Sequence, residues 1–245
     1  MTAGARRATL PQAISGQILK RDFELCAVCG ECANVCPNQA MEKIGKSLSP
    51  DEILSLVSRD KAFYETSGGG LTVSGGEPTF QHAFLMEILR LGRESGIHTA
   101  LETCGCFGQE IVESLVESVD LFLYDIKHVD AGKHREFTGV SNEKIMSNFS
   151  RILSCVGSGR IIPRIPVIPG FNDDGDSVDM VISFLKRSRY SGPVHLMPYN
   201  RMARTKWEKI GRGASYKDMG VLSDDAIESI ASQFEHASFE AVCNS

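Results

Sequence analysis

The sequence has 245 residues, 42% of them hydrophobic, and a net charge of -5 at neutral pH. This length fits one domain, or one domain with a small addition, and the apolar content is sufficient for a full core. The acidic balance gives no electrostatic support for binding nucleic acid. No run of about 18 apolar residues occurs, so we expect no membrane-spanning helix. No apolar stretch follows Arg6 and Arg7, so we expect no signal peptide.

The chain contains eight cysteines but no secretion signal. In that setting, thiols are normally kept reduced and serve metal binding or catalysis rather than disulfide bonds. We therefore expect a cytoplasmic protein that has neither a membrane nor a nucleic acid as its partner.

Four of the cysteines form a dense run, CxxCxxCxxxC followed by Pro37, and they are Cys26, Cys29, Cys32 and Cys36. This spacing is that of bacterial ferredoxins and predicts a [4Fe–4S] cluster. Zinc fits less well, because zinc sites usually pair two distant CxxC knuckles or add histidine. The fourth ligand stays open, since the last cysteine of such a run can serve a second cluster. We assign residues 1–48 to a ferredoxin-like segment and residues 49–245 to the main domain.

Helix and strand patterns alternate from residue 49 onward. Ser49 and Glu52 frame Pro50 in the pattern of a capping box. The strands that we predict are 71–73, 98–102, 121–125, 161–168, 194–197 and 239–242. The helices that we predict are 78–95, 110–116, 131–137, 142–154, 176–187 and 223–235. This alternation predicts a parallel sheet covered by helices, in which Pro163 and Pro166 make their strand irregular or place it near an edge.

The most informative stretch is YETSGGGLTVSGGEPTFQ, residues 64–81. A short strand there ends in Gly75, Gly76 and Glu77 and leads into a helix pattern. Glycine allows the backbone to turn sharply or to approach a ligand closely, and α/β sheets bind ligands at the carboxyl ends of their strands. A carboxylate beside bare backbone suits a ligand with an ammonium group, whereas the GxxxxGK[ST] spacing of a phosphate loop is missing. The alternative is a tight turn with no ligand.

Polar residues also follow other predicted strands. Glu102 and Thr103 end one strand, Asp125 and Lys127 end the next, and Asn200 follows a later one. Parallel strands bring such ends to one rim, which is the usual place for a binding site. Asp125 and Lys127 are two residues apart and project to the same face of an extended chain, so together they suit a zwitterion.

The remaining candidates are weaker. Cys104 and Cys106 fit local packing better than a metal site. His195 lies on a predicted strand, but no pattern assigns it a role. Arg201, Arg204 and Lys206 fit a solvated loop better than a contact with an acidic partner.

Taken together, these segments resemble the activating enzymes of glycyl radical enzymes, the relatives of pyruvate formate-lyase activase in the radical S-adenosylmethionine superfamily. The resemblance covers residues 22 to about 212. The matching segments, in order, are CAVCGECANVCP, YETSGGGLTVSGGEPTFQ, HTALETCG, LFLYDIKHVD, HREFTGVSNEKI and RIPVIPGFND. The resemblance implies an α/β fold, a partial (β/α) barrel of the radical S-adenosylmethionine type with a small ferredoxin-like iron–sulfur insert at the N-terminus.

The resemblance also implies a site. Gly75, Gly76 and Glu77 would meet the methionine amino group of S-adenosylmethionine, and Asp125 and Lys127 would contact its methionine part. Glu102 and Thr103 would lie near a monovalent cation that the family is thought to hold with the help of the Asp125 position. Asn200 stands near the cofactor where many relatives have histidine. No residue is assigned a catalytic role.

By the same resemblance, the activity is a radical S-adenosylmethionine oxidoreductase activity. A 5′-deoxyadenosyl radical takes hydrogen from a glycine of a partner glycyl radical enzyme. A one-electron donor such as flavodoxin or ferredoxin would supply the electron.

One family motif, CxxxCxxC, does not occur in these 245 residues. The sequence therefore resembles a family member that is shortened at its N-terminus, and it leaves the activity of this chain by itself open. The alternative function is a non-catalytic protein, either an iron–sulfur electron carrier or a docking protein for the same partner.

Overall fold

The computed structural model of the chain describes residues 14–15 and 20–243. The chain divides into two compact units. The first combines the N-terminal segment through Ser47 with Arg201–Asp218, and the second combines Leu48–Asn200 with Met219–Ser245.

The first unit is small and contains short elements. Strands β1 (Ile14–Ser15) and β2 (Lys20–Arg21) pair antiparallel. Helix α2 (Glu31–Asn34) starts after Gly30, and helix α10 (Ala203–Lys209) precedes the 3₁₀ turn η5 (Gly213–Ser215). A ferredoxin-like fold is not shown for this segment. It stays a prediction, as does the division into 1–48 and 49–245, and residues 1–13 and 16–19 lie outside the described residues.

Inside this unit, the late segment packs on the early one. A Cβ atom added to Gly211 would lie 2.3 Å from the ring of Phe23, so this ring rests directly on the glycine backbone. Arg204 and Lys206 lie on helix α10, so the solvated loop that we predicted for them is wrong. The sequence offered little sign of this helix, because it presents no buried face that would create an apolar period.

The second unit is built on a parallel sheet. Among the described residues, six strands pair in sequence order with every neighbour parallel. The strands are β3 (Gly70–Val73), β4 (His98–Thr103), β5 (Leu121–Asp125), β6 (Ile161–Val167), β7 (Val194–Pro198) and β8 (Ala241–Cys243). The prediction of a parallel α/β sheet is confirmed. Because all six strands run the same way, their carboxyl ends share one edge.

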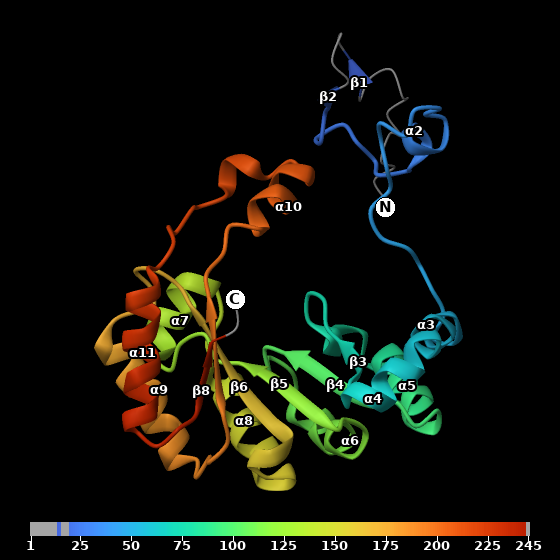
Figure 1. The fold of residues 1–245 in the computed structure, drawn as a ribbon. Coiled ribbons are helices and arrows are strands. Elements are labelled where there is room, and N and C mark those ends of the chain that lie inside the picture. The colour runs from blue at the N-terminus through green and yellow to red at the C-terminus, as the bar shows by residue number, and fades with distance from the viewer. Residues whose placement is uncertain (1–13, 16–19, 244–245) are drawn as a thin grey trace, which may run out of the picture. The chain divides into compact units, whose positions relative to one another are not determined.

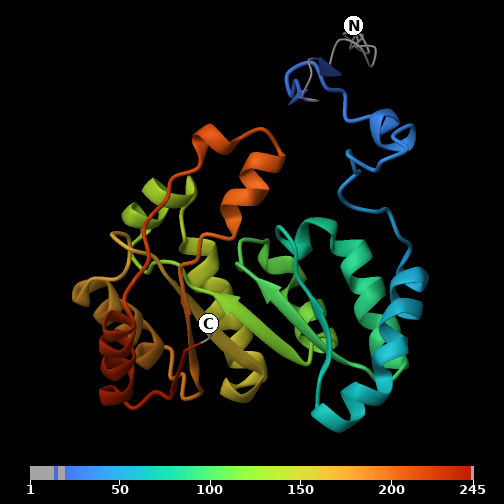
Figure 2. The same ribbon diagram turned by 45° about the horizontal axis from the view of Figure 1, so that its top comes forward.

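Helices cover one face of this sheet. Figures 1 and 2 show α5, α6, α8, α9 and α11 along its outer side. The helical elements of this unit are α3 (Pro50–Val57), η1 (Ser58–Asp60), α4 (Lys61–Ser67), η2 (Pro78–Gln81), α5 (His82–Glu94), η3 (Gln109–Ile111), α6 (Val112–Ser118), α7 (Ala131–Thr138), α8 (Glu143–Val156), η4 (Ser158–Arg160), α9 (Gly175–Arg187) and α11 (Asp224–His236). No helix of the described ranges is long and apolar enough to cross a membrane.

The core lies between the sheet and these helices. Along β5, Phe122 and Tyr124 are fully buried, whereas the alternate residues Leu121, Leu123 and Asp125 are half-buried. Tyr124 packs edge-on against Phe149 of α8, with ring centroids 5.4 Å apart. Strands point alternate side chains to opposite faces, so the half-buried set faces the inner side of the curved sheet. Leu123 and Asp125 belong to this inner set.

Local signals account for several element boundaries. Ser49 and Glu52 form the predicted capping box: the Ser49 side chain accepts from the Glu52 amide, and the Glu52 side chain accepts from the Ser49 amide. The helix predicted from residue 78 begins instead as the 3₁₀ turn η2, and α5 follows at His82. Helix α4 was not predicted, and it too has no buried residues to create a pattern.

Strand β6 corrects another prediction. It lies inside the sheet between β5 and β7, not at an edge, and its buried residues alternate regularly. Pro163 comes just before the first β6–β7 pair, and Pro166 comes after the last β5–β6 pair, which is Asp125 with Arg164. Each proline therefore stands at the end of one ladder, where a missing N–H costs little.

Candidate functional site

The predicted site residues gather at the carboxyl edge of the sheet. Glu77 follows β3 and caps η2, while Thr103 and Asp125 are the last residues of β4 and β5. Lys127 lies two residues beyond β5. Asn200 lies two residues beyond β7 at the same edge, and its side chain is exposed.

The Glu77 carboxylate is held by donors from two segments. From its own turn, the Thr79 amide and hydroxyl donate to Oε1 at 3.2 and 2.8 Å. From the end of β4, the Thr103 hydroxyl lies 2.9 Å from both carboxylate oxygens, and the Cys104 amide donates to Oε2 at 2.9 Å. These bonds tie the end of β3 to the end of β4.

This environment changes what Glu77 can do for a ligand. A carboxylate offers about four acceptor positions, and the donors of Thr79, Thr103 and Cys104 already use most of them. An ammonium group bound here would have to share the carboxylate with these donors. The bonds orient the two oxygens rigidly, whereas the sequence suggested a carboxylate that simply faces the ligand.

The glycines before Glu77 leave the backbone open. Gly75 has φ 135°, and a Cβ atom added to Gly75 or to Gly76 would meet no atom within 4 Å. Both residues are exposed, so their backbone amides are accessible to a ligand. The predicted role of these two glycines is compatible with that geometry and stays a prediction.

Charged side chains form a network on the inner face of the sheet. The Arg164 guanidinium lies 2.9 Å from the Glu102 carboxylate and 3.6 Å from that of Asp125. Lys127 Nζ lies 3.4 Å from Asp125 Oδ2. We call Glu102, Asp125, Lys127 and Arg164 the inner-face network. The prediction placed a monovalent cation near Glu102 and Asp125, and an arginine guanidinium already lies between these two carboxylates.

The inner-face network is partly buried. The side chains of Asp125 and Arg164 are 19% and 16% exposed. Burial raises the pKa of the Asp125 carboxyl, and the nearby charges of Lys127 and Arg164 oppose that rise. Asp125 Oδ1 and Arg164 Nε are buried without a hydrogen bond among the described residues. These two atoms belong to the 3.6 Å ion pair of Asp125 with Arg164, and the less buried ammonium of Lys127 suits a ligand carboxylate.

Sequence reasoning missed Arg164. It stands opposite Asp125 in the β5–β6 register and opposite His195 in the β6–β7 register. Burial lowers the pKa of His195, and the charge of Arg164 lowers it further. A charged residue between the prolines of an otherwise apolar strand was the available signal, and we read that segment only as irregular.

The side chains of Thr103 and Glu102, which are neighbours on β4, point to opposite faces of the sheet. Thr103 is buried on the helix side and donates to Glu77, whereas Glu102 faces the inner side and pairs with Arg164. The sequence placed both beside one cation, but alternate residues of a strand point to opposite faces. Their side chains therefore serve different partners.

The loop after β4 is built by close packing. Gly105 has φ 71°, and a Cβ atom there would lie 1.7 Å from the Tyr124 hydroxyl, so only glycine fits. Asn148 donates to the carbonyls of Gly105 and Phe107 at 2.9 Å. Burial raises the pKa of Cys104 to about 11, and the Glu77 carboxylate contributes to this rise. A neutral thiol at this position fits the packing role that the sequence favoured for Cys104.

The cysteine run lies in the first unit. Cys26 Sγ accepts a hydrogen bond from the Val28 amide at 3.4 Å, and Cys36 Sγ accepts one from the Ala40 amide at 3.3 Å. Backbone amides, first that of Ala40, lower the pKa of Cys36. Because the thiolate is the metal-binding form, this donor chemistry fits an iron–sulfur cluster.

The positions of the four sulfur atoms do not by themselves indicate a cluster. Within the described ranges, no group of three or more histidine, cysteine, aspartate or glutamate side chains is arranged to hold a metal ion. All eight cysteines, each inside those ranges, are free thiols. The assignment of Cys26, Cys29, Cys32 and Cys36 as cluster ligands stays a prediction.

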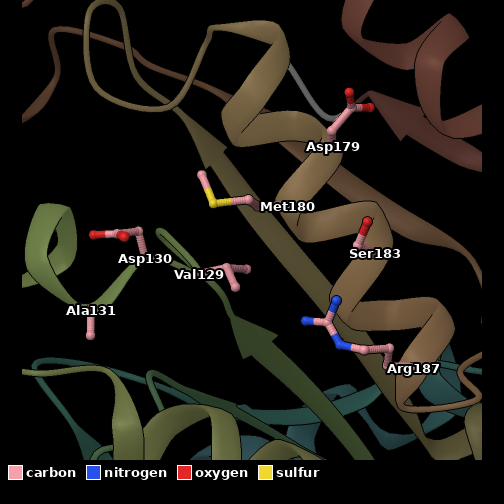
Figure 3. Close-up of a pocket in the computed structure, with 7 residues that line it drawn as sticks. All are labelled: Val129, Asp130, Ala131, Asp179, Met180, Ser183 and Arg187. Atoms are coloured by element: carbon pink, nitrogen blue, oxygen red, sulfur yellow. The ribbon is translucent and has the colours of Figure 1, made fainter.

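A pocket of about 490 Å³ lies apart from the predicted site residues. Figure 3 shows Asp179, Met180, Ser183 and Arg187 on helix α9, across from the segment that follows β5. Its full lining is Val129, Asp130, Ala131, Asp179, Met180, Ser183 and Arg187. None of the predicted site residues contributes to this pocket.

The fold and the site define a class: a parallel (β/α) sheet with charged side chains at its carboxyl edge, in a chain that also carries a run of four cysteines. Residues 29–181 match the family model described as "Radical SAM superfamily". The chain is 36% identical over 215 residues to the 4-hydroxyphenylacetate decarboxylase activating enzyme of Clostridioides difficile (strain CD196), covering 87% of this chain and 67% of that protein. It is also 36% identical over 250 residues to the choline trimethylamine-lyase activating enzyme of Oleidesulfovibrio alaskensis (strain ATCC BAA-1058 / DSM 17464 / G20), covering 87% and 79%.

The chain belongs to the radical S-adenosylmethionine superfamily, and within it to the activating enzymes of glycyl radical enzymes. A solved domain of a pyruvate-formate lyase-activating enzyme from Bacteroides vulgatus ATCC 8482 has a similar fold, with a TM-score of 0.59 and 26% identity. That match covers 72% of this chain and 99% of the other. The family uses a [4Fe–4S] cluster and S-adenosylmethionine, which confirms the two cofactors expected from the sequence. The chain spans about two thirds of the length of the first relative.

Proposed function

We propose that this chain binds S-adenosylmethionine at the carboxyl edge of its sheet and acts in activating a glycyl radical enzyme. Its relatives are activating enzymes for a decarboxylase and for a lyase. The resemblance to the activating enzymes implies that a cluster held by CxxxCxxC, a motif that does not occur in these 245 residues, would reduce the bound cofactor, and that a 5′-deoxyadenosyl radical would then take hydrogen from a glycine of the partner. The particular glycyl radical enzyme stays open.

The observation that carries the proposal is the inner-face network beside Glu77. Lys127 offers a half-exposed ammonium to the carboxylate of the methionine part. Glu77 and the open backbone of Gly75 and Gly76 receive its amino group. Asp125 and Arg164 hold each other and thereby keep the polar edge in place before a ligand arrives, which lowers the cost of ordering on binding.

Several further assignments belong to this proposal. Cys26, Cys29, Cys32 and Cys36 would hold a [4Fe–4S] cluster, and a small electron-transfer protein such as flavodoxin or ferredoxin would deliver the electron. Glu102, Thr103 and Asn200 would lie close to the cofactor. Eight free thiols are compatible with a cytoplasmic location, where thiols stay reduced.

Calorimetry with S-adenosylmethionine on the anaerobically prepared chain tests the proposal. We expect binding to weaken about tenfold or more in Lys127→Ala, because a charge-assisted contact to the carboxylate is lost. Lys186→Ala is the matched control, since Lys186 is an exposed lysine on the outer helix α9. Equal affinity in wild type and Lys127→Ala would place the site elsewhere.

A further inference from the structure

Strands β5 and β6 separate at a defined point. Their last pair is Asp125 with Arg164, and the Ile126 amide donates to the Arg164 carbonyl at 2.9 Å. In a parallel ladder, the next donor would be the amide of residue 166. That residue is Pro166, which has no N–H. The two chains therefore diverge just before Lys127, and the carbonyls beyond this point need other donors.

The side chain of Asn172 fills the gap. Its Nδ2 donates to the Lys127 carbonyl at 2.7 Å and to the Pro166 carbonyl at 2.7 Å, one on each diverging chain. Its Oδ1 accepts from the Ile168 amide at 2.8 Å. Asn172 is 6% exposed. One buried amide group thus replaces the missing ladder contacts and holds the peptide group of Lys127.

A second asparagine does the same for the next two residues. Asn142 Nδ2 donates to the carbonyls of His128 and Val129, both at 2.7 Å. Asn142 is also buried. It contacts the same segment but not Lys127, so it is a natural control for an effect that depends on Lys127.

We propose that Asn172 is a positioning residue for the cofactor site and acts through the backbone of Lys127. The inference rests on the proposed role of Lys127 in binding S-adenosylmethionine. The direction of the lysine side chain depends on the orientation of its peptide group, and Asn172 holds the carbonyl of that group. A change at residue 172 therefore moves the Lys127 ammonium relative to Asp125 without removing any group that touches the ligand.

The test is a double-mutant cycle measured by calorimetry with S-adenosylmethionine on the full 245-residue chain. Asn172→Asp keeps the acceptor for the Ile168 amide but turns an oxygen toward the carbonyls of Lys127 and Pro166. We expect about tenfold weaker binding in Asn172→Asp. In a chain that already carries Lys127→Ala, Asn172→Asp should weaken binding almost no further, because the side chain through which Asn172 acts is already gone.

Two further measurements separate positioning from a general loss of stability. Urea unfolding of Asn142→Asp serves as the reference for a buried asparagine lost from the same segment, and this variant keeps wild-type affinity. Amide hydrogen exchange reports the segment directly, and we expect faster exchange at residues 126–128 in Asn172→Asp. If Asn172→Asp does not fold, Asn172→Ala takes its place in the same cycle.

The outcomes are distinct. Weak binding in Asn172→Asp that does not add to Lys127→Ala supports the proposal. Additive losses, or an equal loss in Asn142→Asp, overturn the positioning role and leave the proposed function intact. Equal affinity in wild type and Lys127→Ala overturns the proposed function, and with it this inference.

Discussion

The hydroxyl of Thr103 lies 2.9 Å from each carboxylate oxygen of Glu77. The two residues are 26 positions apart in the chain, yet they join the carboxyl ends of neighbouring strands. The same hydroxyl accepts from the Gly105 amide at 3.0 Å. One buried side chain thus holds both the Glu77 carboxylate, which we propose receives the amino group of the ligand, and the loop after β4.

Replacing Thr103 by valine should destabilise the fold. The substitution keeps the shape but removes a buried donor to a charged group and an acceptor for the Gly105 amide. We expect the free energy of unfolding to fall by about 2 kcal/mol, measured by urea denaturation. Thr72→Val is the control, because Thr72 is an exposed threonine on β3 and should change stability by less than about 0.5 kcal/mol. Similar losses in both variants would show that the hydroxyl contributes nothing specific.

Replacing Arg164 by methionine should leave two carboxylates without their shared partner. Glu102 and Asp125 would then repel each other on a partly buried surface. We expect a loss of about 2 kcal/mol, below the value for a fully buried pair, because Glu102 is 35% exposed.

The double variant Arg164→Met with Glu102→Gln gives the matched test. Removing the second charge relieves the repulsion, so the double variant should recover part of the lost stability in urea denaturation. Strictly additive losses would contradict the pairing as we describe it.

His128 should make stability depend on pH below neutrality. It is 2% exposed, its Nδ1 accepts from the Asp130 amide at 2.9 Å, and its Nε2 lies 3.1 Å from the Ser177 hydroxyl. Burial, followed by the charge of Lys133, lowers its pKa below the ordinary value of 6.5, although Asp130 and Asp174 oppose that shift and His134 adds to it. Protonation would also remove the acceptor that the Asp130 amide uses.

The direction of this pH dependence is set by the number of protons that the folded and unfolded states bind. Between pH 6.5 and the lower folded pKa, the unfolded chain holds more protons at residue 128 than the native state does. The free energy of unfolding should therefore fall as the pH is lowered through this window. His128→Gln should be less stable at pH 7.5 but should show a shallower slope, whereas His98→Gln, an exposed histidine, should keep the wild-type slope. An unchanged slope in His128→Gln would assign the pH dependence to other groups.

The cysteine run should account for tightly bound iron. After anaerobic reconstitution, we expect iron and sulfide contents to fall sharply in Cys26→Ala, Cys29→Ala and Cys32→Ala. Cys155→Ala and Cys243→Ala are controls, because both thiols are exposed and lie outside the run. Zinc as the sole tightly held metal in the wild-type chain would refute the assignment.

Much of the fold was readable from local patterns, because local forces set those features. The capping box of Ser49 and Glu52 is complete within four residues. The apolar strand ending at Asp125 and the helix periods after it reflect burial against a single neighbouring layer. Helices α4 and α10 were missed because neither has buried residues, so neither shows an apolar period in the sequence.

The residue types at the strand ends, the ferredoxin spacing and the family are properties of the sequence. The side-chain contacts of these residues cannot be read from the sequence, because they depend on strand order and register. Arg164 meets Asp125 through the register of β5 and β6, and Thr103 meets Glu77 because β3 lies beside β4. Asn172 reaches Lys127 across 45 residues because Pro166 ends a ladder there. No local pattern contains these distances, since the free energy that sets them comes from packing the whole sheet against its helices.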